Sequence, residues 1–121
     1  MEKLYKLILD SAFEVHSLLG PGLFENTYKQ CLSHELKLRD VKVDVEKRLP
    51  VFYKGIKLDC GYRIDMLVEK QIVIELKSVD KLTALHMSQL LSYMRLSNKK
   101  LGLLINFNTR FLKDGIKRVV L

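Results

Sequence analysis

Apolar residues recur every three or four positions along the first part of the chain, which is the spacing of a buried helix face. The pattern extends from residue 4 to residue 19 and ends at Gly20-Pro21-Gly22, a combination that stops helices. A second pattern of the same period runs from about Glu25 to Arg39. The sequence therefore predicts two consecutive helices with a sharp turn between them. The residues that form the two apolar faces are Leu4, Leu7, Ile8, Ala12, Val15 and Leu19, then Tyr28, Cys31, Leu32 and Leu36.

Beyond Val41 the apolar residues come in short runs that are typical of β-strands. The runs are separated by Lys54-Gly55 and by Glu69-Lys70-Gln71, so we expect antiparallel hairpins. The predicted strands comprise residues 43–53, 56–60, 62–68 and 72–77.

The last part of the pattern adds one helix and one strand. Thr83 is suited to cap a third helix that runs to about Leu96, and residues 100–107 have the composition of a buried strand. The residues after this strand show no clear pattern. The order helix, helix, three or four strands, helix, strand predicts an α/β (α+β) domain whose helices flank one sheet.

Charged side chains occupy the non-aliphatic face of two predicted strands. Because side chains alternate along a strand, Glu75 and Lys77 point to one side, and Asp65 is on the corresponding side of the preceding strand. A three-residue turn at Glu69-Lys70-Gln71 places Asp65 directly across from Glu75. The aliphatic residues on the opposite face are Ile72, Ile74 and Leu76, and on the preceding strand Ile64, Met66 and Val68.

Two adjacent carboxylates repel each other unless a cation lies between them, and Mg²⁺ prefers such oxygen ligands. A metal at Asp65 and Glu75 can stabilise the charge that develops on a phosphodiester and can lower the pKa of a bound water. Lys77 would then orient that water or offset phosphate charge. An E-x-K triplet on a half-exposed strand is also common as an ordinary solvated face, so the triplet alone does not identify a catalytic site.

Polar residues on two predicted helices strengthen the catalytic hypothesis. Glu25 shares a stripe with Tyr28 and Leu32, where a carboxylate needs a partner, although near a helix N-terminus it also favours the helix dipole. On the third helix Gln89 and Tyr93 share a stripe with His86. This second stripe is alternatively an exposed polar face.

Composition and charge limit the classes of protein that need to be considered. A chain of 121 residues, 48% hydrophobic and 29% charged, is expected to form one globular domain spanning residues 1–121. Its apolar runs are too short for a membrane span, and Cys31 and Cys60 show no pairing motif, so we expect a soluble, cytoplasmic protein. The net charge of +7 favours a polyanionic partner. Nucleotide-binding loops and zinc-ligand spacings are absent from the sequence.

The chain resembles the GxxExxY proteins, a bacterial and archaeal family within the PD-(D/E)-x-K nuclease superfamily. The naming motif is Gly22-Leu23-Phe24-Glu25-Asn26-Thr27-Tyr28, and the resemblance extends over nearly the full length. Further matching segments are residues 59–65, the Ile74-Glu75-Leu76-Lys77 segment, the helix segment 86–93 and residues 103–108.

The resemblance implies a restriction-endonuclease-like αβββαβ core with a central mixed sheet and a metal-dependent nuclease activity. It assigns Mg²⁺ (or Mn²⁺) as cofactor and nucleic acid, DNA more than RNA, as partner. The proline of the PD motif is replaced here by Ile64. The residues that the resemblance implies are Glu25, Asp65, Glu75 and Lys77 at the catalytic centre, Gln89 and Tyr93 beside it, and Asp65, Glu75, Glu25 and the Leu76 carbonyl as metal ligands.

Two other functions remain open on the sequence. One is a nucleic-acid-binding module that keeps the fold without turnover, which the basic charge favours. The other is a protein-interaction subunit or one half of a homodimer, because one unit of this size covers only part of a duplex.

Overall fold

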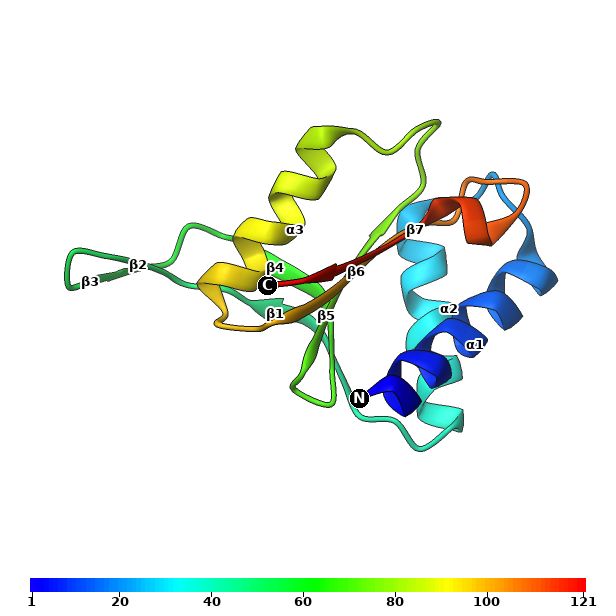
Figure 1. The fold of residues 1–121 in the computed structure, drawn as a ribbon, viewed down its shortest axis with the longest axis horizontal. Coiled ribbons are helices and arrows are strands. Elements are labelled where there is room, and N and C mark those ends of the chain that lie inside the picture. Colours follow the sequence, from blue (N-terminus) through cyan, green and yellow to red (C-terminus); the bar gives the residue numbers. More distant parts are fainter.

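The computed structural model describes all 121 residues and consists of a central five-stranded sheet with helices on both faces (Figure 1). Helices α1 (Glu2–Leu19) and α2 (Glu25–Leu38) cover one face, and α3 (Ala84–Leu96) covers the other. This arrangement confirms the predicted α/β class and is consistent with a restriction-endonuclease-like core. None of the helices combines the length and the apolar character needed to cross a membrane.

The central sheet is mixed, as expected. Its strand order is β1-β4-β5-β6-β7, in which β5 and β6 are parallel and the other neighbours are antiparallel. A parallel pair requires a crossover connection, and α3 supplies it between β5 and β6. The strands are β1 (Val43–Arg48), β4 (Arg63–Val68), β5 (Ile72–Lys77), β6 (Leu101–Asn106) and β7 (Ile116–Val120).

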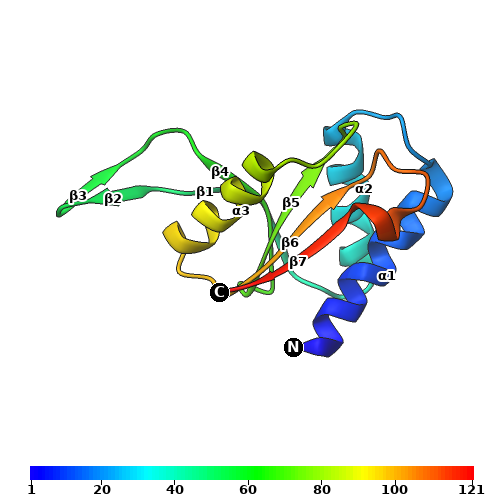
Figure 2. The same cartoon turned by 45° about the horizontal axis from the view of Figure 1, so that its top comes forward.

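A separate two-stranded hairpin, β2 (Val51–Tyr53) and β3 (Ile56–Leu58), projects away from the rest of the molecule (Figure 2). The prediction of one continuous strand over residues 43–53 is therefore wrong. The chain leaves the sheet at Leu49-Pro50, because proline has no N–H to continue a ladder.

The C-terminal residues add an element that the sequence pattern did not indicate. A short 3₁₀ helix, η1 (Leu112–Gly115), leads into β7, which pairs only with β6 at the edge of the sheet. The exposed charged residues Lys117 and Arg118 interrupt the apolar sequence pattern of this edge strand.

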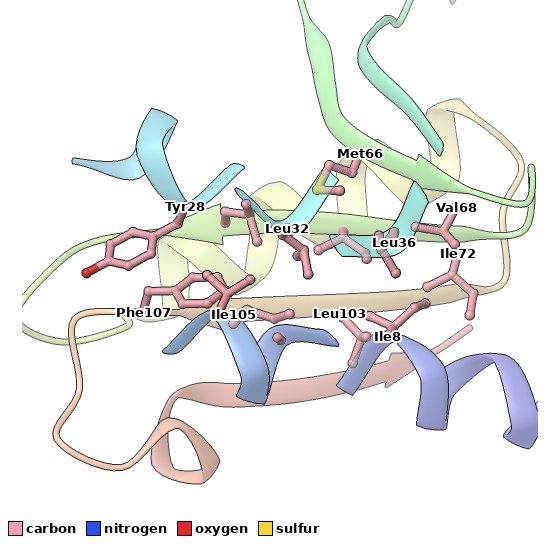
Figure 3. Close-up of a cluster of buried hydrophobic side chains, with 14 of the residues drawn as sticks. Ile8, Tyr28, Leu32, Leu36, Met66, Val68, Ile72, Leu103, Ile105 and Phe107 are labelled. Atoms are coloured by element: carbon pink, nitrogen blue, oxygen red, sulfur yellow. The ribbon is translucent and has the colours of Figure 1, made fainter. Parts of the chain in front are cut away.

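The larger part of the core lies between the sheet and the helices α1 and α2 (Figure 3). Tyr28 and Phe107 stack here with ring centroids 4.6 Å apart, which fixes α2 against the end of β6. Full burial of each large apolar side chain contributes roughly 1.5–3 kcal/mol. Other members of this cluster include Ile8, Leu32, Leu36, Met66, Ile72 and Leu103.

A smaller cluster packs beneath α3. The predicted cap of this helix is confirmed, since Thr83 Oγ1 accepts a hydrogen bond from the His86 N–H and His86 Nδ1 accepts one from the Thr83 N–H. Gly102 allows the helix to approach β6 closely, because a Cβ there would lie 2.5 Å from the Met94 sulfur. The helix thereby directs Gln89 and Tyr93 toward the end of β5.

Candidate active site

The turn between β4 and β5 sets which residues face each other across these strands. Val68 pairs with Ile72 around residues 69–71, which confirms the predicted three-residue turn. In this register Asp65 and Glu75 occupy opposite positions. The regular pairing of the two strands ends one position earlier, at Met66 and Ile74.

Asp65 and Glu75 replace the missing backbone pairing with their own carboxylates. The Asp65 N–H donates to Glu75 Oε1 at 3.1 Å, and the Leu76 N–H donates to Asp65 Oδ2 at 2.9 Å. Each carboxylate therefore accepts a hydrogen bond from the backbone of the other's strand. In a strand, the N–H and the C=O of one residue point toward the same neighbouring strand. The Leu76 carbonyl therefore points toward β4, where the backbone pairing of the two strands is missing.

Burial and mutual repulsion strongly perturb Glu75. Only 4% of this residue is exposed. Desolvation, together with the neighbouring Asp65 charge, raises the pKa of Glu75 to about 9. The site therefore favours a proton on Glu75, or another cation beside it, at neutral pH.

Lys29 of α2 supplies positive charge to the carboxylates. Its ammonium lies 3.4 Å from Asp65 Oδ1 and also donates to Glu46 of β1. Burial disfavours the charged form, but the contacts with Glu46 and Asp65 outweigh it, so the pKa of Lys29 is raised. The sequence prediction missed Lys29, although it stands three and seven positions before the buried Leu32 and Leu36, on the same helix face.

The alternation of side chains along β4 is interrupted at Asp65. Met66 packs beneath α1 and α2, whereas Ile64 packs beneath α3. The prediction that Ile64 shares a face with Met66 is therefore wrong. On the side of β4 that faces β1, Glu46 adopts a left-handed φ of 55° and leaves the β1–β4 ladder. At Asp65, β4 therefore lacks regular backbone pairing with both β1 and β5.

Lys77 is held by two polar residues of α3. Its ammonium donates to Gln89 Oε1 at 3.2 Å, and Gln89 Nε2 donates to the Tyr93 hydroxyl at 3.2 Å. Desolvation raises the pKa of Tyr93, so its hydroxyl keeps its proton at neutral pH. The ring of Tyr62 lies 6.0 Å from that of Tyr93 and extends this polar chain toward the base of the hairpin.

Glu25 stands in the first turn of α2 and is half-buried. Desolvation raises the pKa of its carboxyl, an effect that Lys77 opposes and Asp65 reinforces. These interactions place Glu25 within electrostatic range of the other acidic residues. No three His, Cys, Asp or Glu side chains are grouped closely enough to form a preassembled metal site, so Glu25 lies apart from the Asp65–Glu75 pair.

The turn before α2 is fixed by Tyr28. Its hydroxyl donates to the Gly20 carbonyl at 2.6 Å and accepts from the Leu23 N–H at 3.1 Å. Ser78, next to Lys77, donates to the Leu23 carbonyl at 2.6 Å. These bonds tie the start of α2 to the end of β5 and so bring Glu25 toward Lys77.

The remaining polar residues near the site have structural contacts. His16 Nε2 lies 2.8 Å from the Thr109 carbonyl and joins α1 to the loop after β6. The buried side chain of Asn106 exchanges two hydrogen bonds with the backbone of Val79. His86 belongs to the cap of α3 and does not extend the stripe of Gln89 and Tyr93 into the site.

A cavity of about 770 Å³ lies at the other end of the strands from Asp65 and Glu75. It is lined mainly by charged residues around Asp40, Lys42 and Lys70, and it is open to solvent. A shallower depression of about 370 Å³ borders Gln89. The pair of Asp65 and Glu75, rather than the larger cavity, combines facing carboxylates with a buried acid of raised pKa, a combination that is common at functional sites.

The donor atoms at the end of β4 and β5 suit a hard divalent ion. Two carboxylates and a backbone carbonyl meet where regular pairing stops, and oxygen ligands of this kind are those of Mg²⁺ and Mn²⁺. Burial and the neighbouring Asp65 charge raise the pKa of Glu75, so a cation beside the pair would stabilise the ionised carboxylates. The residues present therefore fit such an ion.

The mixed sheet with helices on both faces and the acidic pair at the strand ends define a restriction-endonuclease-like domain. The chain belongs to the PD-(D/E)XK nuclease superfamily, whose family profile matches residues 2–119. No curated protein and no solved structure matches the chain significantly.

Proposed function

We propose that this chain is a metal-dependent nuclease that hydrolyses phosphodiester bonds of nucleic acid. The observation that carries the proposal is the pair of facing carboxylates, in which Glu75 accepts from the Asp65 N–H and Asp65 accepts from the Leu76 N–H, with Lys77 two residues after Glu75 on β5. Membership of the PD-(D/E)XK nuclease superfamily supports a nuclease-type function.

In this proposal Asp65, Glu75 and the Leu76 carbonyl bind Mg²⁺ or Mn²⁺, and Glu25 acts as a further ligand. The bound ion would lower the pKa of a water molecule and offset the charge of the phosphodiester. The backbone N–H groups of Asp65 and Leu76 hold the two carboxylates in place before any ligand arrives. A cation held beside Glu75 would favour its ionised form.

Lys77 provides positive charge at the reacting phosphate. Its ammonium is restrained by Gln89, which is restrained in turn by the protonated Tyr93 hydroxyl. A fixed cation stabilises charge in the transition state better than a mobile one, because it needs no reorganisation during the reaction. We propose Gln89 and Tyr93 as positioning residues that act through Lys77.

We further propose that the chain is a GxxExxY-type member of the superfamily and that residues 1–121 form one domain. The hydrogen bonds of Tyr28 support the first point, because they give the tyrosine of the motif a physical role at the turn before Glu25. The net charge of +7 supports a nucleic-acid substrate, for which we propose DNA rather than RNA.

A catalytically inactive nucleic-acid-binding module is the second candidate. It is favoured by one observation: the Lys29 ammonium already neutralises Asp65 as a metal ion would. In such a module the salt bridge between Lys29 and Asp65 is permanent, and the binding of nucleic acid does not depend on Asp65 or Glu75.

Cleavage of labelled single-stranded, duplex and branched DNA, and of RNA, with Mg²⁺ or Mn²⁺ tests the proposal. The wild-type protein should cleave at least one substrate, and Asp65→Asn and Lys77→Ala should each abolish cleavage. Asp44→Asn is a matched control, because Asp44 is an exposed acid on β1. Cleavage that persists in Asp65→Asn identifies a contaminating enzyme, and salt-sensitive binding without cleavage selects the inactive module.

A further inference from the structure

The hairpin of β2 and β3, with its connections over residues 49–62, forms an arm that projects from the sheet (Figures 1 and 2). It leaves the sheet at the end of β1 and returns at the start of β4. Asp65 is in the first half of β4, and Glu75 is near the end of β5. The arm therefore extends from the same end of the sheet as the candidate active site.

The arm carries large apolar side chains that nothing covers. Phe52 is 63% exposed, Tyr53 is 59% exposed and Ile56 is 59% exposed. Tyr53 pairs with Ile56 across the hairpin and shares a face with Val51 and Leu58, whereas the intervening pair, Phe52 and Lys57, lies on the opposite face. A two-stranded hairpin alone is marginally stable in water, so exposed aromatic residues on it indicate a surface that meets a partner.

The charge of the arm determines the kind of partner. Residues 47–63, the arm with the strand residues that flank it, contain five Lys or Arg residues and a single acid, Asp59. The ammonium of Lys54 lies 5.4 Å from the ring centroid of Tyr53, and that of Lys57 lies 6.0 Å from the ring centroid of Phe52. Each exposed ring is therefore accompanied by a cation.

We propose that this arm binds an unpaired segment of nucleic acid, with Phe52 and Tyr53 stacking on bases and Lys54 and Lys57 contacting phosphates. Aromatic side chains paired with cations are the features that bind single strands, because every base offers a π-face and every nucleotide a negative charge. A second copy of this chain is a poorer occupant, since two arms in contact would bring Lys54 and Lys57 of each copy together with only Asp59 to offset them. The inference rests on the proposed function for the identity of the polymer.

The base of the arm is connected to the site. Leu49 is buried beneath α3, and its N–H donates to the Tyr62 carbonyl at 3.0 Å, which closes the base of the arm. The Tyr62 ring meets Tyr93, which holds Gln89 and through it Lys77. A strand bound along the arm is thereby directed toward Lys77.

Fluorescence anisotropy with a labelled single-stranded oligonucleotide, in EDTA so that no cleavage occurs, tests the proposal. Phe52→Ala/Tyr53→Ala should weaken binding roughly fivefold or more, because one lost base stack has at least that effect. Lys54→Ala/Lys57→Ala should weaken binding and reduce the slope of log K against log salt by roughly 1.4, the contribution of two phosphate contacts to a single strand.

Lys113→Ala/Lys117→Ala is the control for charge. It also removes two positive charges, from exposed positions in η1 and in the edge strand β7, and it should leave the affinity within about twofold of the wild type. None of the six substituted side chains is buried, so circular dichroism and the melting temperature should be unchanged in all three variants.

Unchanged affinity of Phe52→Ala/Tyr53→Ala overturns the proposal, as does an equal loss in the control variant. A dimer in light scattering that Phe52→Ala/Tyr53→Ala dissociates, with oligonucleotide binding intact, assigns the arm to a second copy instead. The two proposals can fail separately. Binding that depends on the arm, without cleavage of any substrate, contradicts the nuclease activity and supports the role of the arm. Cleavage by arm variants that bind with normal affinity supports the nuclease activity and contradicts the role of the arm.

Discussion

The Lys29 ammonium lies 3.4 Å from Oδ1 of Asp65, and both side chains are almost fully buried. The contact joins α2 to β4 at the point where β4 loses its regular pairing with β5. Lys29 therefore acts as the resident cation of an acidic cluster that would otherwise repel itself. A metal ion at Asp65 must share this carboxylate with Lys29 or displace it.

Replacement of Lys29 by methionine should destabilise the metal-free protein by about 1–3 kcal/mol, because Asp65 and Glu46 lose a buried partner. Urea unfolding measures this change. Lys37→Met on the exposed side of the same helix is the control and should change stability by no more than about 0.5 kcal/mol. Equal effects of the two substitutions would show that the Lys29 contacts contribute nothing specific.

The stability of the metal-free protein should decrease as the pH rises from about 4.5, the ordinary pKa of a glutamate carboxyl, toward 9. Glu75 has a raised pKa of about 9 when folded and a value near 4.5 when unfolded, so between these values the folded state binds the extra proton. Its contribution to stability is complete below the unfolded pKa and is lost as the pH rises through the folded one.

Glu75→Gln should flatten this pH dependence, since glutamine does not titrate. Denaturant unfolding of both proteins in EDTA at several pH values from 5 to about 9 measures the effect, which for one proton is at most about 1.4 kcal/mol per pH unit. Parallel profiles for the wild type and Glu75→Gln would show that Glu75 is not the titrating group.

Tyr28→Phe should lower stability by about 1–2 kcal/mol, because two hydrogen bonds to the turn before α2 are lost while the stacking on Phe107 remains. The variant should also cleave more slowly, since the start of α2 carries Glu25. Thermal unfolding and a cleavage assay provide the two readouts. Tyr5→Phe is the control: the Tyr5 hydroxyl is buried without a hydrogen-bond partner, so its removal should cost nothing.

Gln89→Ala should reduce the maximal rate of cleavage by roughly tenfold or more, because Lys77 loses its restraint and effective orientation. Substrate affinity should change little, so the effect should appear in kcat rather than in KM. Ser88→Ala, at an exposed neighbouring position, is the control. A change confined to KM would instead assign Gln89 to substrate binding.

Most of the fold could be predicted from the sequence, because its periodic faces are strong. The two N-terminal helices, the Thr83 cap and the buried β6 all follow from apolar spacing and helix-capping chemistry. The arm and β7 could not be predicted in this way. Pro50 ends β1 inside an apolar run, and β7 is an edge strand with exposed charges at Lys117 and Arg118.

The pairing of Asp65 with Glu75 could be predicted from the turn length and the alternation of faces. The same rule failed for Ile64, because alternation is interrupted where the carboxylates replace the ladder. Lys29 and Glu46 were missed for a related reason. Lysine on an apolar helix face and a left-handed glutamate in a strand both contradict local preference, and it is the contact between Lys29 and Glu46 in the folded chain that accounts for them.

Isothermal titration of the metal-free protein with Mn²⁺ tests the central claim most directly, because it measures the ion at the carboxylates without requiring the correct substrate. The account predicts saturable binding by the wild type and by Asp44→Asn, and none by Asp65→Asn. Absence of binding by the wild type, or undiminished binding by Asp65→Asn, would contradict it.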